Sequence, residues 1–141
     1  MDQWDYFSFL FRQGIIVGSR WYLTFLFCLL FILMLYKTFK VDKTPYKKIY
    51  LLSLIPFLFP ILMLVWGTFF EHTEFYTTYA PDWQLNGLSG ILYLQLGIHL
   101  ACLVYFKGIR LVVAALALLQ MYFTLPFYLV AYMSVGGVWL K

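Results

Sequence analysis

The chain has 141 residues, of which 64 % are hydrophobic and 23 % aromatic, while only 11 % are charged. A soluble domain carries roughly 25 % charged residues, so this composition excludes an ordinary soluble globular protein. The net charge of +4 comes largely from lysines beside apolar segments, and it therefore does not indicate a nucleic-acid partner.

Residues 2–16 predict a short amphipathic helix with Asp2 as a suitable N-cap. Its apolar residues recur at spacings of three and four: Trp4, Phe7, Phe11 and Ile15. Polar residues line another side of the same helix. We expect this helix to lie flat in the head-group layer of a membrane, with docking on a partner protein as the alternative. Asp2 and Asp5 stand where a signal peptide has its basic region, so we expect no cleavable signal.

Gly14 and Gly18 form a G-x-x-x-G pattern just before the first long apolar stretch. This pattern marks close helix packing when it lies inside a span of about 20 apolar residues. Here Arg12 and Arg20 flank it, so it lies outside such a span. We expect a bend at this point, between the surface helix and the first span.

Four long apolar stretches follow, at 21–39, 49–70, 85–106 and 109–135. The apolar core of a bilayer is about 30 Å thick and takes ~20 helical residues to cross. Since a backbone exposed to lipid must satisfy its own hydrogen bonds, each stretch predicts a transmembrane helix. The fold class expected is an all-α integral membrane protein, with one domain, 1–141. It is a four-transmembrane-helix bundle preceded by the interfacial helix.

Basic residues gather on one side of this expected bundle. Five lysines occupy loop 37–48, and Lys107 and Arg110 flank the third loop, whereas loop 71–84 has acidic residues and no basic one. The positive-inside rule then places loop 37–48 on the cytoplasmic side of a bacterial inner membrane or an organellar equivalent, with both termini outside. All five tryptophans fall at or near the outer interface of this arrangement. The lysines expected to contact lipid head groups are Lys37, Lys40, Lys43, Lys47 and Lys48.

Prolines interrupt two of the four stretches. Pro56 and Pro60 each remove a helical hydrogen bond, so the second span should kink near the middle of the membrane. Pro126 should bend the over-long fourth span near the outer leaflet. Gly136 and Gly137 predict the end of that helix.

The third and fourth spans each carry a polar pair, Gln95 with His99 and Gln120 with Thr124, four residues apart and hence on one side of a helix. At about 1.5 Å per residue, Gln95 and Gln120 lie at the same depth. We expect a hydrogen bond between these two side chains. Small residues occupy the opposite side of the third span: Gly90, Gly97 and Ala101. The third helix should therefore have neighbours on both sides.

His99 is the candidate cofactor-binding residue, because polar groups within a membrane are costly and often functional. Four roles for His99 are open: haem ligation, a proton relay, contact with a quinone-like ligand, or a plain hydrogen bond inside the bundle. His72, the only other histidine, lies about 21 Å away in depth, so the two cannot share one iron. A haem would then need a ligand from another subunit or a single axial ligand. We predict no bound cofactor, with His99 as the residue that would contact a haem or quinone.

No metal site or catalytic motif is recognisable in the sequence. His72 and three acidic residues in loop 71–84 match no standard metal-site spacing. Cys28 and Cys102 differ in depth by about 15 Å, too far for a disulfide between them. Phosphate loops, nucleophile elbows and zinc-protease motifs are missing. We therefore expect no enzyme.

These features predict a non-catalytic accessory subunit of a larger membrane complex, such as an energy-transducing or transport assembly. Its partners would be membrane lipids and other membrane subunits, met by the side of Gln95 and His99 or by the N-terminal helix. The alternative is a self-assembling small channel, pore or membrane-disrupting effector. In that homo-oligomer the polar path would come from four residues per chain: Gln95, His99, Gln120 and Thr124.

Overall fold

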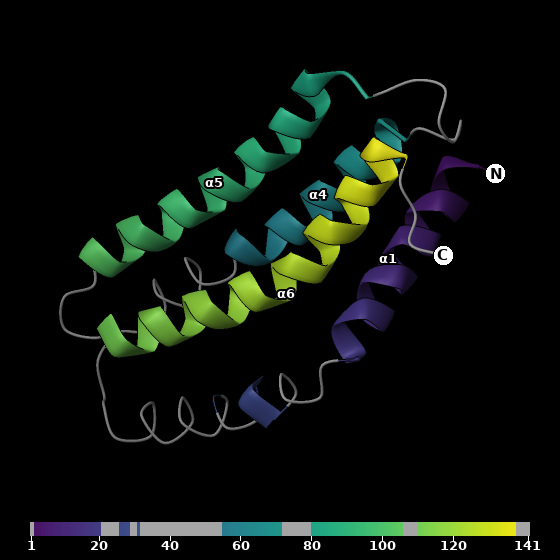
Figure 1. Cartoon of the computed structure of the whole chain (residues 1–141). Coiled ribbons are helices and arrows are strands. Elements are labelled where there is room, and N and C mark those ends of the chain that lie inside the picture. The colour runs from purple at the N-terminus through teal and green to yellow at the C-terminus, as the bar shows by residue number, and fades with distance from the viewer. Residues whose placement is uncertain are drawn as a thin grey trace.

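The structure is a computed structural model, and it describes residues 2–20, 26–28, 31, 55–71, 80–105 and 110–137. The elements are α1 (Gln3–Ser19), the 3₁₀ turn η1 (Ile55–Phe57), α4 (Leu58–Phe69), α5 (Asp82–Tyr105) and α6 (Arg110–Gly136), arranged as in Figure 1. Within these ranges the chain is helical apart from turns and connections, and contains no strand. The all-α class is therefore confirmed for the described part of the chain.

Several predictions lie outside the described residues. They concern most of the first span, the lysines of loop 37–48, the start of the second span and residues 72–79. Within the first span, residues 26–28 and 31 are described and are helical. Of residues 110–112 in α6, only the backbone is described.

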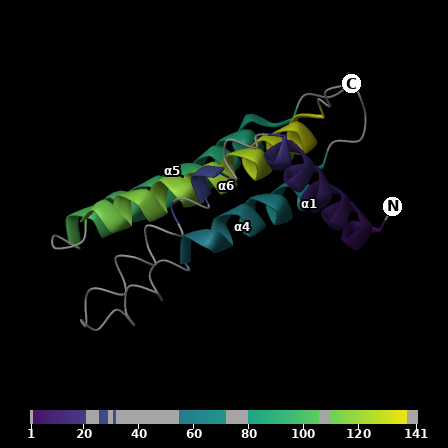
Figure 2. The ribbon, with the colours of Figure 1, turned by 90° about the horizontal axis from the view of Figure 1, so that it is seen from below.

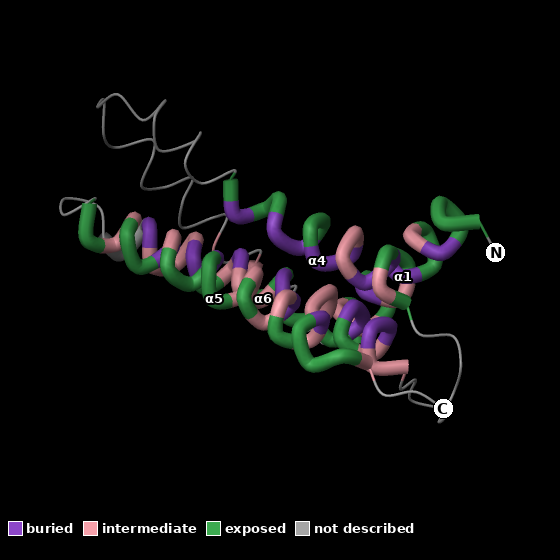
Figure 3. Tube along the Cα trace, turned by 90° about the horizontal axis from the view of Figure 1, so that it is seen from above, coloured by how far each residue is buried: buried purple, intermediate pink, exposed green. Residues whose placement is uncertain are grey.

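Two helical segments, Asp82–Tyr105 and Val113–Gly136, are long and apolar enough to cross a bilayer. They correspond to the third and fourth predicted spans. The segment Ile55–Phe69 is a shorter apolar helix and covers the later part of the second predicted span. Figure 3 shows buried positions recurring along each helix with exposed positions between them.

The N-terminal helix α1 begins as predicted, because the Asp2 carboxylate accepts a hydrogen bond from the Gln3 N–H at 2.7 Å. It runs further than predicted, through both glycines to Ser19, so the expected bend at Gly14 and Gly18 is wrong. A methyl group at Gly14 would lie 2.7 Å from the Phe127 ring, and one at Gly18 would lie 3.6 Å from Pro126. The two glycines thus let α1 approach α6 closely, as small residues do between membrane helices.

The orientation of α1 also differs from the prediction. Its buried residues are Tyr6, Leu10 and Gly14, while Trp4 and Ile15 are exposed. Tyr6 and Leu10 pack with Leu64 and Val130, from α4 and α6. Packing against α4 and α6 therefore decides which side of α1 is buried, and the side with Trp4 and Ile15 faces outward.

Helix α1 crosses α6 obliquely (Figure 2). Tyr6 is bonded to Ser134, and Gly18 lies beside Pro126, eight residues earlier in α6. Eight helical residues span about 12 Å. Between Tyr6 and Gly18, α1 therefore advances along α6 by this distance as it crosses it, and its placement in a head-group layer stays a prediction.

Helices α4, α5 and α6 pack around a small apolar centre made by Met63, Leu88 and Ala131, one residue from each helix. The backbones of α4 and α6 approach closely where a methyl group at Gly67 would lie 3.0 Å from the Cα of Ala131. Such an approach is possible only because residue 67 has no side chain.

Two prolines lie at the start of the α4 region and one lies in the second half of α6. Pro56 lies in η1 and Pro60 in the first turn of α4, so the described chain changes from 3₁₀ to α geometry between them. Helix α6 includes Pro126 and ends at Gly136, followed by Gly137 with a φ of 65°. Its predicted end is confirmed, because a left-handed glycine commonly terminates a helix.

Candidate functional site

One side of α5 is turned into the protein and carries three of its polar residues. Its buried residues are Gln84, Leu88, Gln95 and His99. Their spacings of four and seven place them on one side of the helix. Gln95 is 0 % exposed and His99 6 % exposed, so both are covered within the chain. The partner contact expected on this side stays a prediction.

Gln95 joins α5 to α6 through Thr124. Its Nε2 donates to the Thr124 hydroxyl at 2.8 Å, and this hydroxyl donates to the backbone carbonyl of Gln120, also at 2.8 Å. The prediction chose the right helices but the wrong acceptor, because Gln95 meets Thr124, one turn along α6 from the predicted Gln120. The shorter threonine is the partner because its hydroxyl can accept from Gln95 and donate to its own helix at once.

Two polar atoms in this region are buried without a hydrogen bond in the described part of the chain. They are Oε1 of Gln95 and Nε2 of His99. Since α5 and α6 are antiparallel and Gln95 meets Thr124, His99 lies one turn further along α5, level with Gln120. The two unpaired atoms therefore belong to one polar layer between these helices.

The 3₁₀ turn η1 borders the same layer, as it packs against both α5 and α6. Gly67 of α4 lies beside Ala131 of α6, and the two helices run in the same direction. Pro56 and Gln120 precede these two residues by the same number of positions, so they lie at about the same depth. Pro60 has no N–H to donate to the carbonyl four residues earlier, that of Pro56. Irregular helix geometry and polar side chains thus coincide at one depth.

A second polar cluster joins three helices near the other end of α6. The hydroxyls of Tyr6 and Ser134 lie 2.8 Å apart, and Ser134 Oγ donates to the carbonyl of Gly67 at 2.7 Å. The pKa of Tyr6 is raised above its ordinary value, mainly because the phenol is buried. The hydrogen bond with Ser134 lowers this pKa in part, and the negative charge of Glu71 raises it. This cluster was not predicted from the sequence, although the small residues Gly67, Ala131 and Ser134 are typical of close helix packing.

Aromatic rings gather where α4 ends and α5 begins. Trp83 packs edge-on against Trp66 and Phe70, with ring centroids 6.3 and 5.1 Å away. Trp66 Nε1 donates to the carbonyl of Gln84 at 3.0 Å. A methyl group at Gly87 would lie 2.5 Å from the Trp66 ring. The glycine therefore makes room for the indole that links the two helices.

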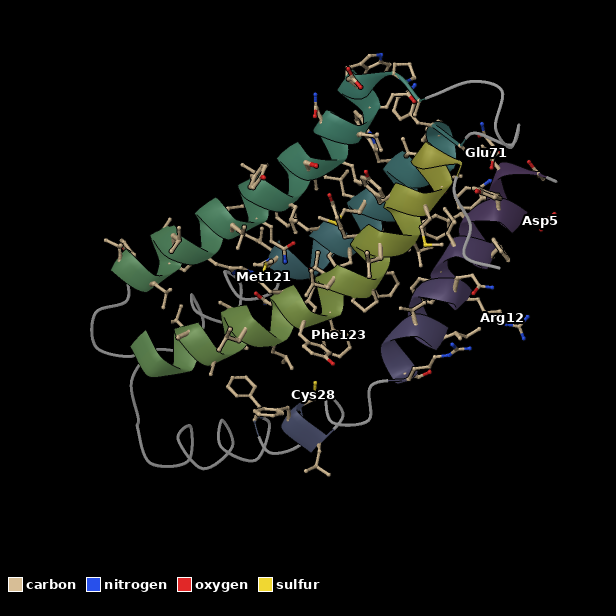
Figure 4. All side chains as sticks on the ribbon, in the orientation of Figure 1. Asp5, Arg12, Cys28, Glu71, Met121 and Phe123 are labelled. Atoms are coloured by element: carbon tan, nitrogen blue, oxygen red, sulfur yellow. The ribbon has the colours of Figure 1, made fainter. Side chains whose placement is uncertain are left out.

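The buried polar side chains of the described residues carry amide, hydroxyl and imidazole groups. Within those residues no group of three His, Cys, Asp or Glu side chains is placed to hold a metal ion. Cys28 and Cys102 are free thiols on separate helices. Figure 4 shows Asp5 and Arg12 projecting away from the bundle, so these charged groups take no part in the polar layer.

Comparison of the chain with protein families, with curated proteins and with solved structures finds no match.

Proposed function

We propose that this chain is a non-catalytic integral membrane subunit of a larger membrane complex, such as an energy-transducing or transport assembly. The observation that supports the proposal is that large apolar side chains of α5 and α6 lie on the surface of the chain, while polar side chains such as Gln95 and Gln120 are buried. Only 17 % and 22 % of the apolar segments of α5 and α6 are buried within the chain. The core helix of a soluble protein would be mostly buried, so these helices need lipid or other subunits around them.

The outward surface of both helices is formed by large apolar side chains. Those most exposed are Tyr93, Leu100, Val104, Tyr105 and Leu118. An apolar surface of this extent is unstable in water and marks a membrane or protein interface. In the proposed membrane arrangement both termini are outside and loop 37–48 is on the cytoplasmic side of an inner membrane or organellar equivalent.

The polar residues favour a subunit over a self-assembling pore. A pore shared by several copies needs a polar stripe on the surface that faces the other copies. Gln95 and Thr124 are 0 % exposed and Gln120 is 2 % exposed, and all three belong to contacts within the chain. Their burial favours a role in holding the helices together.

Among the described residues, two outward surfaces are available to neighbouring subunits. One is the exposed side of α1, with Trp4 and Ile15. The other is the side of α5 with Gly90 and Gly97, where a methyl group would meet no atom within 4 Å. The neighbour expected there from the sequence would have to come from lipid, from another subunit or from a part of this chain outside the described residues.

The composition of the native particle tests the proposal. The full chain, tagged at one end, is extracted from its own membrane in mild detergent, and the intact particle is weighed by native mass spectrometry. We expect a discrete particle that contains several different chains, whose identities would name the process. A particle that contains only this chain in a fixed small number would contradict the subunit role and favour the channel or effector.

A further inference from the structure

The unpaired atoms of the polar layer point to a binding site that the proposed function does not use. Gln95 Oε1 and His99 Nε2 are both buried and both without a hydrogen bond among the described residues. An unpaired polar atom in apolar surroundings is costly, so buried polar groups are almost always satisfied. Two of them one turn apart on the same side of α5 therefore indicate a shared partner.

The polar atoms that surround Gln95 and His99 limit which group can be the partner of the two unpaired atoms. Gln95 Nε2 and the Thr124 hydroxyl are already bonded to each other and to the carbonyl of Gln120. Gln120 itself has a further interaction. The partner of Gln95 Oε1 and His99 Nε2 must therefore be a group beyond this chain of hydrogen bonds.

The chemistry of the two atoms defines that group. An amide oxygen can only accept a hydrogen bond, whereas an imidazole nitrogen donates or accepts according to its tautomer. A hydroxyl group has one proton to donate and lone pairs with which to accept. It therefore satisfies both atoms at once if His99 carries its proton on Nε2.

We infer that Gln95 and His99 together bind one hydroxyl group, which donates to Oε1 of Gln95 and accepts from the Nε2–H of His99. The hydroxyl belongs either to an internal water molecule or to a membrane-soluble organic molecule such as a quinol. Internal waters typically bridge buried polar groups in this way. This inference does not depend on the subunit role, because the two residues are buried within a single chain.

Nuclear magnetic resonance of the histidine ring tests the inference directly. The full chain is labelled with ¹⁵N-histidine and placed in phospholipid nanodiscs, with His72→Gln leaving His99 as the only histidine. We expect a protonated, hydrogen-bonded Nε2 whose signal shifts in Gln95→Leu. Ser89→Ala is the matched control: it also removes a contact between α5 and α6, the 3.2 Å pair of Ser89 and Tyr128, but leaves the layer intact. Gln95→Met replaces the leucine variant if that variant does not fold.

The source of the hydroxyl is read from two further signals. Magnetisation transfer between the Nε2 proton and water, lost in the Gln95 variant and kept in Ser89→Ala, identifies an internal water. A bound molecule in native mass spectra of the extracted chain that disappears in His99→Phe identifies an organic hydroxyl. An Nε2 that is bonded directly to Gln95 Oε1, or that has no partner at all, would overturn the inference.

Discussion

At the scale of single residues, Ser134 links α6 to both α1 and α4 through one hydroxyl group. It lies 2.8 Å from the Tyr6 hydroxyl and donates to the Gly67 carbonyl. Hydrogen bonds between membrane helices are worth only about 0.6 kcal/mol on average. Their effect here is to fix the position and rotation of α1, because Tyr6 must be at one place along α6 to meet Ser134.

Ionisation of Tyr6 should weaken this contact at high pH. Burial raises the pKa of Tyr6 above its ordinary value of about 10, so the neutral phenol is the form that the folded state favours. The stabilisation is then fully present below pH ~10 and is lost as the pH rises through the raised pKa. The free energy of unfolding, measured by detergent titration from pH 8 upward, should fall more steeply for the native chain than for Tyr6→Phe. Parallel curves for the two proteins would mean that Tyr6 titrates as an ordinary exposed tyrosine.

Two glycines offer a matched test of packing. Gly67→Ala places a methyl group 3.0 Å from the Cα of Ala131, so α4 and α6 must separate, and overpacking of this kind costs about 1–3 kcal/mol. Gly97→Ala adds the same group to α5 where no atom lies within 4 Å. Thermal unfolding should show a clear loss of stability for the first variant and no loss, or a gain of up to ~1 kcal/mol, for the second. If Gly67→Ala lost no more stability than Gly97→Ala, the close approach of α4 and α6 at Gly67 would be contradicted.

At the scale of the elements, α1 depends on its glycines for its contact with α6. Gly14→Ala would place a methyl group 2.7 Å from the Phe127 ring, whereas Gly18→Ala would make an ordinary contact of 3.6 Å with Pro126. The first variant should move α1 away from α6, and the second should leave it in place.

The distance between spin labels at the exposed positions Arg12 and Leu129 measures this movement. Cys28 and Cys102 are first replaced by serine so that each label has one site. A longer and broader distance is expected only for Gly14→Ala. If neither variant changes the distance, the contact of α1 with α6 does not depend on these glycines.

Much of the arrangement of the elements follows from the sequence alone. The Asp2 cap, the long helices α5 and α6 and the end of α6 at Gly136 rest on local signals: a capping side chain, an apolar run and a pair of glycines. The depth match between Gln95 and α6 also needs only the constant rise of a helix. A feature that depends only on residues close to it along the chain can therefore be predicted from the sequence.

The features that the sequence does not determine depend on helix rotation and on the choice among near-equivalent partners. Apolar residues surround α1 on several sides, so its own pattern does not reveal that Tyr6 and Leu10 are buried while Trp4 is exposed. Likewise α6 offered Gln95 two acceptors one turn apart, Gln120 and Thr124, and counting the helical rise did not tell them apart. The role of Gly14 and Gly18 was misread because flanking arginines are compatible with both a bend and a close contact.

At the scale of the whole molecule, polar groups lie between the helices and large apolar side chains cover the outside of α5 and α6. Phe123, for example, leaves α6 on the side away from α5 (Figure 4). This inside-out distribution, relative to a soluble protein, stabilises the fold only where lipid or other apolar subunits surround it. We therefore expect the outward side of α5 to face such surroundings.

Collision measurements on spin labels test this placement of α5. Labels are placed singly at Leu94 and Leu100, which are exposed, and at the buried control position Leu88, with the purified chain in phospholipid vesicles. Oxygen, which dissolves in lipid, should collide often with the labels at 94 and 100 and rarely with the label at 88, while a water-soluble nickel complex should reach none of them. Frequent collisions of the nickel complex at 94 and 100 would contradict the membrane placement of α5 and with it the proposed role.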